Sequence, residues 1–329
     1  MLSGYGIVFN SQEINFETNR GFLMKQKLLK PAVAAVVLGV AMFAAGSAVA
    51  GIANTKHNLG AEGTGTNKTT ATGEICVFCH TPHGADTGEG VAVPLWNKTL
   101  SDPLAFKTYD QLGTSGTSTY DAAQANIGSV TLACLTCHDG TQAIDNIINA
   151  PGSGGYDSTG GGAGGLEWGW EVAGSDPLSV DATGTLIATS IANLGTDLTN
   201  DHPVSMQYGG GGISASNPVG PMRDGDFVMP KKVDGLNRWY VDNDFMAAKG
   251  TGSTADVLDV WDYKLYTRTV TGADPRGVQF AGEDEPFVEC GSCHDPHLET
   301  TTFLRISTEA QDGGMSNAGS QICLACHTK

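Results

Sequence analysis

This 329-residue chain has no cysteine outside one kind of motif. All eight cysteines belong to four copies of C-x-x-C-H, so none remains for a separate disulfide framework. Basic side chains are scarce, with 18 Lys and Arg against 35 Asp and Glu, and the net charge is −17. Such an acidic surface argues against nucleic acid and anionic lipid as binding partners.

The four motifs predict covalent attachment of c-type haem. In each copy the two thiols bind one porphyrin, and the histidine that follows binds its iron from one face. The attachment cysteines are Cys76 and Cys79 in the first motif, Cys134 and Cys137 in the second, Cys290 and Cys293 in the third, and Cys323 and Cys326 in the fourth. The corresponding proximal histidines are His80, His138, His294 and His327. We therefore expect four haem c groups as the cofactors.

Two other sites use the same residue types. Pairs of C-x-x-C can bind zinc, and a single C-x-x-C can be a redox dithiol. Neither site requires a histidine directly after the second cysteine in all four copies. Haem attachment is therefore the preferred interpretation.

Four further histidines match the four sixth positions of the irons. These distal candidates are His57, His83, His202 and His297. The simplest assignment is bis-histidine ligation of every iron, with the eight methionines as alternative axial ligands. Six-coordinate irons have no open site for a substrate. We therefore predict a carrier of electrons that is not an enzyme.

The amino-terminal region predicts export. Residues 24–50 resemble a signal peptide, with a basic start, an apolar segment at 31–45 and a small-residue cleavage site at 48–50. A membrane anchor is the alternative, but the apolar segment is short for a span of about 20 residues. Residues 1–23 show no export pattern and are interpreted as a mis-annotated upstream extension.

The predicted mature chain, residues 51–329, carries 14 basic and 33 acidic side chains, a net charge of −19. It also shows an internal duplication. A lone histidine, an extended motif C-x-x-C-H-x-P-H and a plain motif occur in module one, at about 51–150, and again in module two, at about 166–329. A glycine-rich segment at about 151–165 separates the two, so two haem pairs are the expected modules.

The second histidine of each extended motif must bind a different haem from the first. Only three residues separate His80 from His83, too few to reach the opposite face of the same porphyrin. We assign His83 to the haem of the second motif and, by analogy, His297 to that of the fourth. A surface histidine in a proline-containing turn is the alternative.

The fold class expected is a multihaem cytochrome c, mostly loop, with a core formed by stacked haems. Glycine is abundant, at 45 residues, and the runs at 152–165 and 209–212 favour neither helix nor strand. We predict short helices at the motifs, one more at 118–126, and a few short strands. The aromatic stretches at 238–245 and 257–267 are predicted to pack over haems.

Acidic side chains at Asp242, Asp244 and 283–285 are a weaker signal. They could bind calcium, but neither group has the spacing of an EF-hand loop. A solvated acidic loop is the preferred interpretation.

The layout resembles a known family. The extended motif CVFCHTPH, the segment DHPV at 201–204 and the count of four motifs resemble the extracellular multihaem cytochromes that polymerise into conducting filaments in metal-reducing bacteria. The tetrahaem OmcE type is most similar, and the hexahaem OmcS type is a larger relative. The resemblance covers the layout of the mature chain, although the glycine-rich middle carries no specific motif.

This resemblance implies a continuous file of haems in which one iron takes its distal histidine from a neighbouring subunit. The implied donor is His57, reaching the third motif of the next subunit, while His202 would bind the haem of the first motif in its own chain. The implied function is long-range extracellular electron transfer by a conductive filament or nanowire.

The implied partners are identical subunits, upstream outer-membrane or periplasmic cytochromes, and extracellular acceptors such as metal oxides. The expected location is extracellular or at the cell surface, with the periplasm as the alternative. A monomeric periplasmic tetrahaem shuttle is the first alternative function. A multihaem reductase with one open haem is the second, and a structural or binding module would leave four covalent haems without a use.

Overall fold

The computed structural model describes ten parts of the chain: 51–86, 93–112, 124–158, 168–172, 179–233, 236, 238–243, 257–273, 279–306 and 320–328. The chain divides into two units, Met1–Val49 and Ala50–Lys329. The predicted upstream extension and signal peptide lie outside the described residues. In the parts that are described, no helix is long and apolar enough to cross a membrane.

Each motif lies at a short helical segment. The segments are η2 Cys76–Phe78, α2 Ser129–His138, α4 Cys290–Cys293 and α5 Gln321–Cys326. A helical turn places residues three apart on one face, so both thiols of a motif point to the same side of their segment. Most of the remaining described chain is loop with single 3₁₀ turns, at η1 Gly51–Asn54, η3 Pro103–Ala105, η4 Tyr109–Leu112, η5 Pro151–Ser153, η6 Tyr208–Gly210 and η7 Thr301–Phe303.

The helix predicted at 118–126 is wrong where the structure describes it. Gln124 forms an antiparallel bridge with Met206 instead of a helical turn. Residues 118–123 lie outside the described chain.

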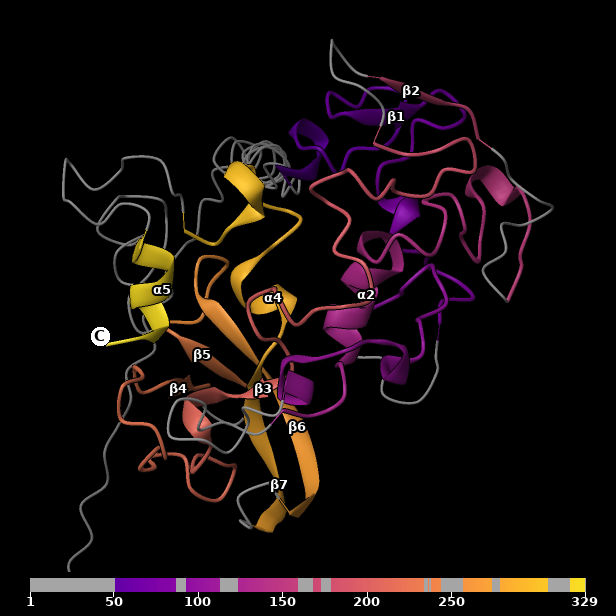
Figure 1. Ribbon diagram of the computed structural model, residues 1–329. Helices are drawn as coiled ribbons and strands as arrows, with labels where there is room; N and C mark the ends of the chain where they lie inside the picture. Colours follow the sequence, from indigo (N-terminus) through magenta and orange to yellow (C-terminus); the bar gives the residue numbers. More distant parts are fainter. Residues whose placement is uncertain are drawn as a thin grey trace, which may run out of the picture. The chain divides into compact units, whose positions relative to one another are not determined.

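The strands form two antiparallel sheets. A small ribbon pairs β1 Asn67–Thr69 with β2 Trp170–Val172, with Thr69 opposite Trp170. The larger sheet has five strands in the order β3-β7-β6-β5-β4 (Figure 1). Its strands are β3 Met206–Gln207, β4 Lys231–Lys232, β5 Trp239–Val241, β6 Tyr263–Ala273 and β7 Gln279–Val288.

The expectation of short strands is wrong for the hairpin of β6 and β7. These strands are 11 and 10 residues long, and the hairpin they form is the longest element in Figure 1. The sequence of β6, YKLYTRTVTGA, is rich in aromatic and β-branched residues, a composition that favours an extended chain.

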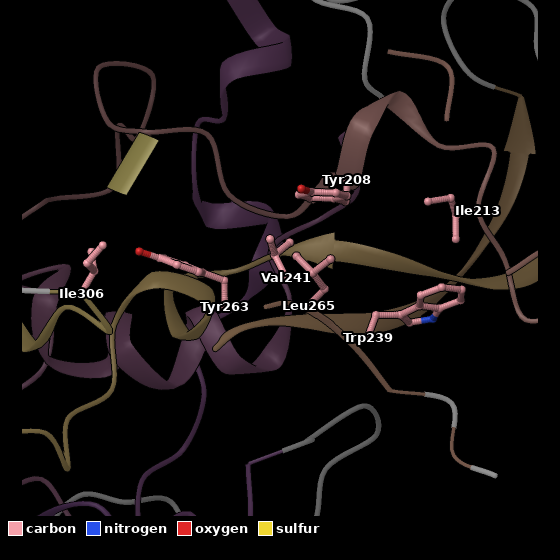
Figure 2. Close-up of a cluster of buried hydrophobic side chains, with 7 residues drawn as sticks. All are labelled: Tyr208, Ile213, Trp239, Val241, Tyr263, Leu265 and Ile306. Carbon is pink, nitrogen blue, oxygen red and sulfur yellow. The ribbon is translucent and has the colours of Figure 1, made fainter. Parts of the chain in front are cut away.

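An apolar cluster of the second half surrounds thiols of the third and fourth motifs. Figure 2 shows its seven buried side chains: Tyr208, Ile213, Trp239, Val241, Tyr263, Leu265 and Ile306. Cys293, Ile322 and Cys326 pack against this cluster. The predicted aromatic stretches, in their described parts β5 and β6, therefore lie beside two attachment sites.

Two smaller clusters combine residues of module one with residues at 180–198, at the start of module two. One contains Val77, Phe78, Ile144, Ile147, Val180 and Leu186, with Cys79, Cys137 and Trp170 packed against it. The other contains Phe106, Ile127, Leu132, Leu135 and Leu198 and covers one side of α2. The protein side chains thus form several small cores, two of which adjoin attachment thiols.

The acidic groups considered for calcium have other roles where they are described. Asp242 forms a 2.6 Å ion pair with Lys231. Glu285 is buried in β7 and accepts a hydrogen bond from the side-chain amide of Gln207, so a solvated loop is the wrong description of it. Asp244 lies outside the described residues, and over the described chain no three His, Cys, Asp or Glu side chains converge as ligands of one ion.

Asp262, which precedes β6, makes the stability of the fold depend on pH. Burial raises the pKa of its carboxyl to about 6, although the backbone N–H groups of Asn243 and Asp259 donate hydrogen bonds to it at 2.9 and 2.8 Å. Its unfolded pKa is about 3.9, so the folded state keeps a proton that the unfolded state loses. This contribution to stability is full below about pH 4 and disappears as the pH rises through about 6.

We expect the free energy of unfolding to fall by about 2–3 kcal/mol through that pH interval because of Asp262. Asp262→Asn should remove this part of the pH dependence. Guanidinium unfolding of both proteins at a series of pH values from 4 to 8 measures it, and parallel curves for the two would contradict the assignment.

Candidate haem sites

Two proximal histidines each face another histidine across a gap. The ring centres of His138 and His57 are 6.1 Å apart, and those of His80 and His297 are 6.3 Å apart. A metal–imidazole bond is about 2.0 Å long, so two imidazoles on opposite sides of one metal ion have ring centres about 6 Å apart. Both pairs therefore fit the axial ligands of one iron each.

A third pair involves the fourth motif. Burial lowers the pKa of His202, and the nearby His327 lowers it further. The ring of His327 is also covered by Phe227, with 4.3 Å between ring centres. The charge of His327 therefore reaches His202, which places His202 in the region of the fourth motif.

His83 and His294 are left over. Both are exposed, and neither ring contacts another histidine among the residues that the structure describes. His83 therefore has no histidine ring opposite it in the described chain. His294 has none either, although its charge lowers the pKa of both His57 and His138.

These positions differ from the sequence-based map of distal ligands. His57 faces the second motif of its own chain, where His83 was expected, and His297 faces the first motif, where His202 was expected. His202 lies near the fourth motif, where His297 was expected. Nearness along the chain underlay the assignments of His83 and His297, and the family resemblance underlay those of His57 and His202. In the structure the two modules interlock: Asn54, close to His57, donates a 2.8 Å hydrogen bond to Glu299 of module two.

Packing explains why the His57 ring faces a motif of its own chain. Its ring stacks on Phe303 with 4.2 Å between ring centres. Burial lowers the pKa of His57 to about 4, helped by the charges of His138, His297 and His294. The imidazole is therefore neutral at pH 7, the form that binds a metal ion.

Hydrogen bonds set the tautomer of four other rings. A carbonyl oxygen can only accept, so Nδ1 of each ring carries the proton and Nε2 is free to bind iron. The bonds run from His80 to Pro94 (2.9 Å), His138 to Ala192 (2.7 Å), His294 to Thr302 (2.8 Å) and His202 to Pro203 (3.1 Å).

The thiols of successive motifs lie near one another in chain order. Cys79 of the first motif interacts electrostatically with Cys137 of the second. Cys134 and Cys290, from the second and third motifs, lie close enough for their thiols to interact. Cys293 of the third motif in turn interacts with the fourth motif. The four attachment sites therefore form one continuous series.

A cavity adjoins the first motif. Its volume is about 520 Å³, and its lining includes Cys76, His80, His83, Asn149 and Pro151. Cavities that bind cofactors and other small molecules usually measure about 300–1,000 Å³. The space beside this motif is therefore large enough for a prosthetic group.

Asn97 and Lys98, which the sequence reasoning missed, link the first motif to residues 143–149, which follow the second motif. Asn97 donates hydrogen bonds to the carbonyls of Val77 (2.6 Å) and Asn149 (3.0 Å) and accepts one from the backbone of Asn149 (2.9 Å). The buried ammonium of Lys98 donates to Ala143 and Asn146, both at 3.0 Å. Nothing in the spacing of the motifs indicated these contacts, because they depend on long-range packing.

Asn97→Ala is expected to lower the free energy of unfolding by about 2–4 kcal/mol, because it removes three hydrogen bonds at a fully buried position. Chemical denaturation followed by circular dichroism measures the change. The control is Asn217→Ala, an exposed position whose hydrogen bonds are local, with an expected change within about 0.5 kcal/mol. Equal effects of the two variants would contradict the linking role.

Comparison with protein-family models and with curated proteins finds no match to this chain. The function proposed for it therefore depends on its own motifs and geometry.

Proposed function

We propose that residues 51–329 form a tetrahaem c-type cytochrome that carries electrons over long distances outside the cell. The observation that carries the proposal is the spacing of the two histidine pairs, 6.1 and 6.3 Å between ring centres at two C-x-x-C-H motifs. Four haems, when bound, would supply reversible one-electron oxidation and reduction of iron without binding a substrate.

The protein's contribution is to hold the attachment sites in series. Each thiol binds the edge of its own porphyrin, so thiols of neighbouring motifs in contact bring two porphyrin edges together. The contact between Cys134 and Cys290 supports a link in the middle of the series. Electrons would then pass from the first motif to the fourth through short steps.

The two unmatched histidines support polymerisation. We propose that His83 of one subunit binds the iron of the third motif, opposite His294, in the next subunit. His57, His297 and His202 then serve the second, first and fourth motifs of their own chain. An interface between two different surface patches that does not close on itself produces an open filament.

The proposed partners are identical subunits, an upstream outer-membrane or periplasmic cytochrome as electron donor, and extracellular acceptors such as metal oxides. The proposed location is the cell exterior, which agrees with the export signal predicted at 24–50. The acidic surface would keep an exported protein soluble and does not favour nucleic acid as a partner.

Cryo-electron microscopy of the secreted haem-staining fraction tests the proposal, together with the mass of the intact chain. The expected result is filaments with four haems per subunit in a continuous file and His83 at the subunit junction. Monodisperse particles with four six-coordinate irons would indicate a soluble periplasmic shuttle instead. A chain without covalent haem would overturn the proposal entirely.

A reductase is the second candidate, and one observation favours it. If the chain remains a monomer, His294 has no distal partner among the described residues, and the third motif would have an open axial position. A high-spin haem that binds nitrite or cyanide in the purified protein would support this alternative.

A further inference from the structure

One distal histidine differs from the other histidines in the group that accepts the hydrogen bond from its Nδ1–H. His297 donates to a carboxylate oxygen of Asp295 at 2.9 Å. The four rings with a carbonyl partner, His80, His138, His294 and His202, donate to uncharged backbone oxygens. Nδ1 of His57 is buried without a hydrogen-bond partner.

Asp295 is held firmly in this position. Its side chain is 12% exposed, and its second carboxylate oxygen lies 3.2 Å from Nη1 of Arg305, which is itself 3% exposed. Arg305 also donates to the carbonyl of Gly291 at 3.1 and 3.2 Å. The backbone N–H of His297 donates to Asp295 as well, at 3.1 Å. The carboxylate therefore cannot turn away from the imidazole.

We propose that Asp295 is a positioning residue that lowers the reduction potential of the haem attached at Cys76 and Cys79. This inference rests on the proposed function, since it requires His297 to be the distal ligand opposite His80. An imidazole that donates to a carboxylate gains negative character and becomes a stronger ligand. A stronger anionic ligand stabilises ferric iron over ferrous iron, because reduction by one electron removes one positive charge from the metal.

A neighbouring charge acts in the opposite direction but more weakly. Lys98 lies near Cys79, at the thiol edge of the same site, and its ammonium is shared between two carbonyl oxygens. Asp295, in contrast, is hydrogen-bonded to the ligand of the iron itself. The adjacent second motif has His57, whose Nδ1 has no acceptor, as its distal candidate. The first haem should therefore have a lower potential than the second, which favours electron transfer from first to second.

The test is a mediated spectropotentiometric titration of the haem-loaded wild type and of Asp295→Asn. The side-chain oxygen of asparagine can still accept the hydrogen bond from Nδ1–H of His297, but it carries no charge. His297 would then resemble the four histidines that donate to backbone carbonyls. We expect one of the four one-electron components to move to higher potential, with the other three unchanged. The electron paramagnetic resonance signal of one low-spin haem should change with it, and Asp295→Glu should restore part of the wild-type potential.

Asp295→Asn also removes the carboxylate that pairs with Arg305. The double variant Asp295→Asn/Arg305→Met removes both charges. One component should still move to higher potential, but by less than in Asp295→Asn, because loss of the Arg305 cation acts in the opposite direction. Four low-spin haems with unshifted potentials in Asp295→Asn, or an equal shift of all four, would overturn the inference. Fewer than four low-spin haems in the wild type would instead overturn the proposed function on which it rests.

Discussion

Replacing His83 by alanine is expected to abolish filament assembly and leave a folded monomer. Under the proposed arrangement His83 supplies the sixth ligand of a neighbouring subunit, so its loss leaves one iron per chain five-coordinate. Because its side chain is exposed, the fold itself should be little affected. Electron microscopy and size-exclusion chromatography measure assembly, and the high-spin signal in electron paramagnetic resonance counts the five-coordinate irons.

His57→Ala is the matched comparison, because it removes a distal histidine that faces its own chain. It should also produce one high-spin haem, at the second motif, but filaments should persist. Added imidazole should restore the low-spin state of the His83 variant without restoring filaments. If His57→Ala loses filaments while His83→Ala keeps them, His57 is the ligand between subunits, as the family resemblance implied. The proposed role of His83 is then wrong.

Replacing Glu289 by alanine is expected to lower the free energy of unfolding by about 3–5 kcal/mol, since it leaves several buried partners unpaired. Glu289 is the N-cap residue of α4, and its carboxylate accepts hydrogen bonds from Thr131 of α2 at 2.5 Å and from Ser205 at 2.9 Å. Arg268 lies 3.5 Å away on its other side. One carboxylate thus joins the helices that carry the second and third motifs.

Glu289→Gln should be less severe, at about 1–3 kcal/mol, because the amide keeps the shape and one acceptor. Burial raises the pKa of Glu289, so the ionised form costs free energy in the folded state and stability decreases as the pH rises through that pKa. The glutamine variant should lack this pH dependence. Guanidinium unfolding measures each change, with the exposed Glu62→Ala as the control within about 0.5 kcal/mol. Equal stability of Glu289→Ala and the control would refute the bridging role.

The attachment chemistry could be predicted from the sequence because it is local. Two thiols three residues apart and the next histidine belong to one helical turn, and the described structure has such a turn at each motif. The number of distal candidates was equally visible, since a histidine outside the motifs can be counted. Neither prediction required knowledge of which segments meet in space.

The strands and the linking polar residues were harder to predict. The aromatic and β-branched residues of β6 were present in the sequence, but the abundance of glycine suggested that only short strands would form. Asn97, Lys98 and Glu289 are polar residues of kinds that usually face solvent. Their burial depends on carbonyls and hydroxyls contributed by segments far away in the chain, such as Asn149 and Thr131, and no local pattern indicates these partners.

By itself the sequence determined the number of C-x-x-C-H motifs, the cysteines and histidines that belong to them, and the presence of one further histidine for each motif. Only the tertiary structure decided which distal histidine faces which motif. His297 lies three residues after His294 but faces His80, more than two hundred residues away, because the two halves of the chain interlock. The physical reason is that covalent attachment depends on spacing within one turn, whereas axial pairing depends on long-range packing.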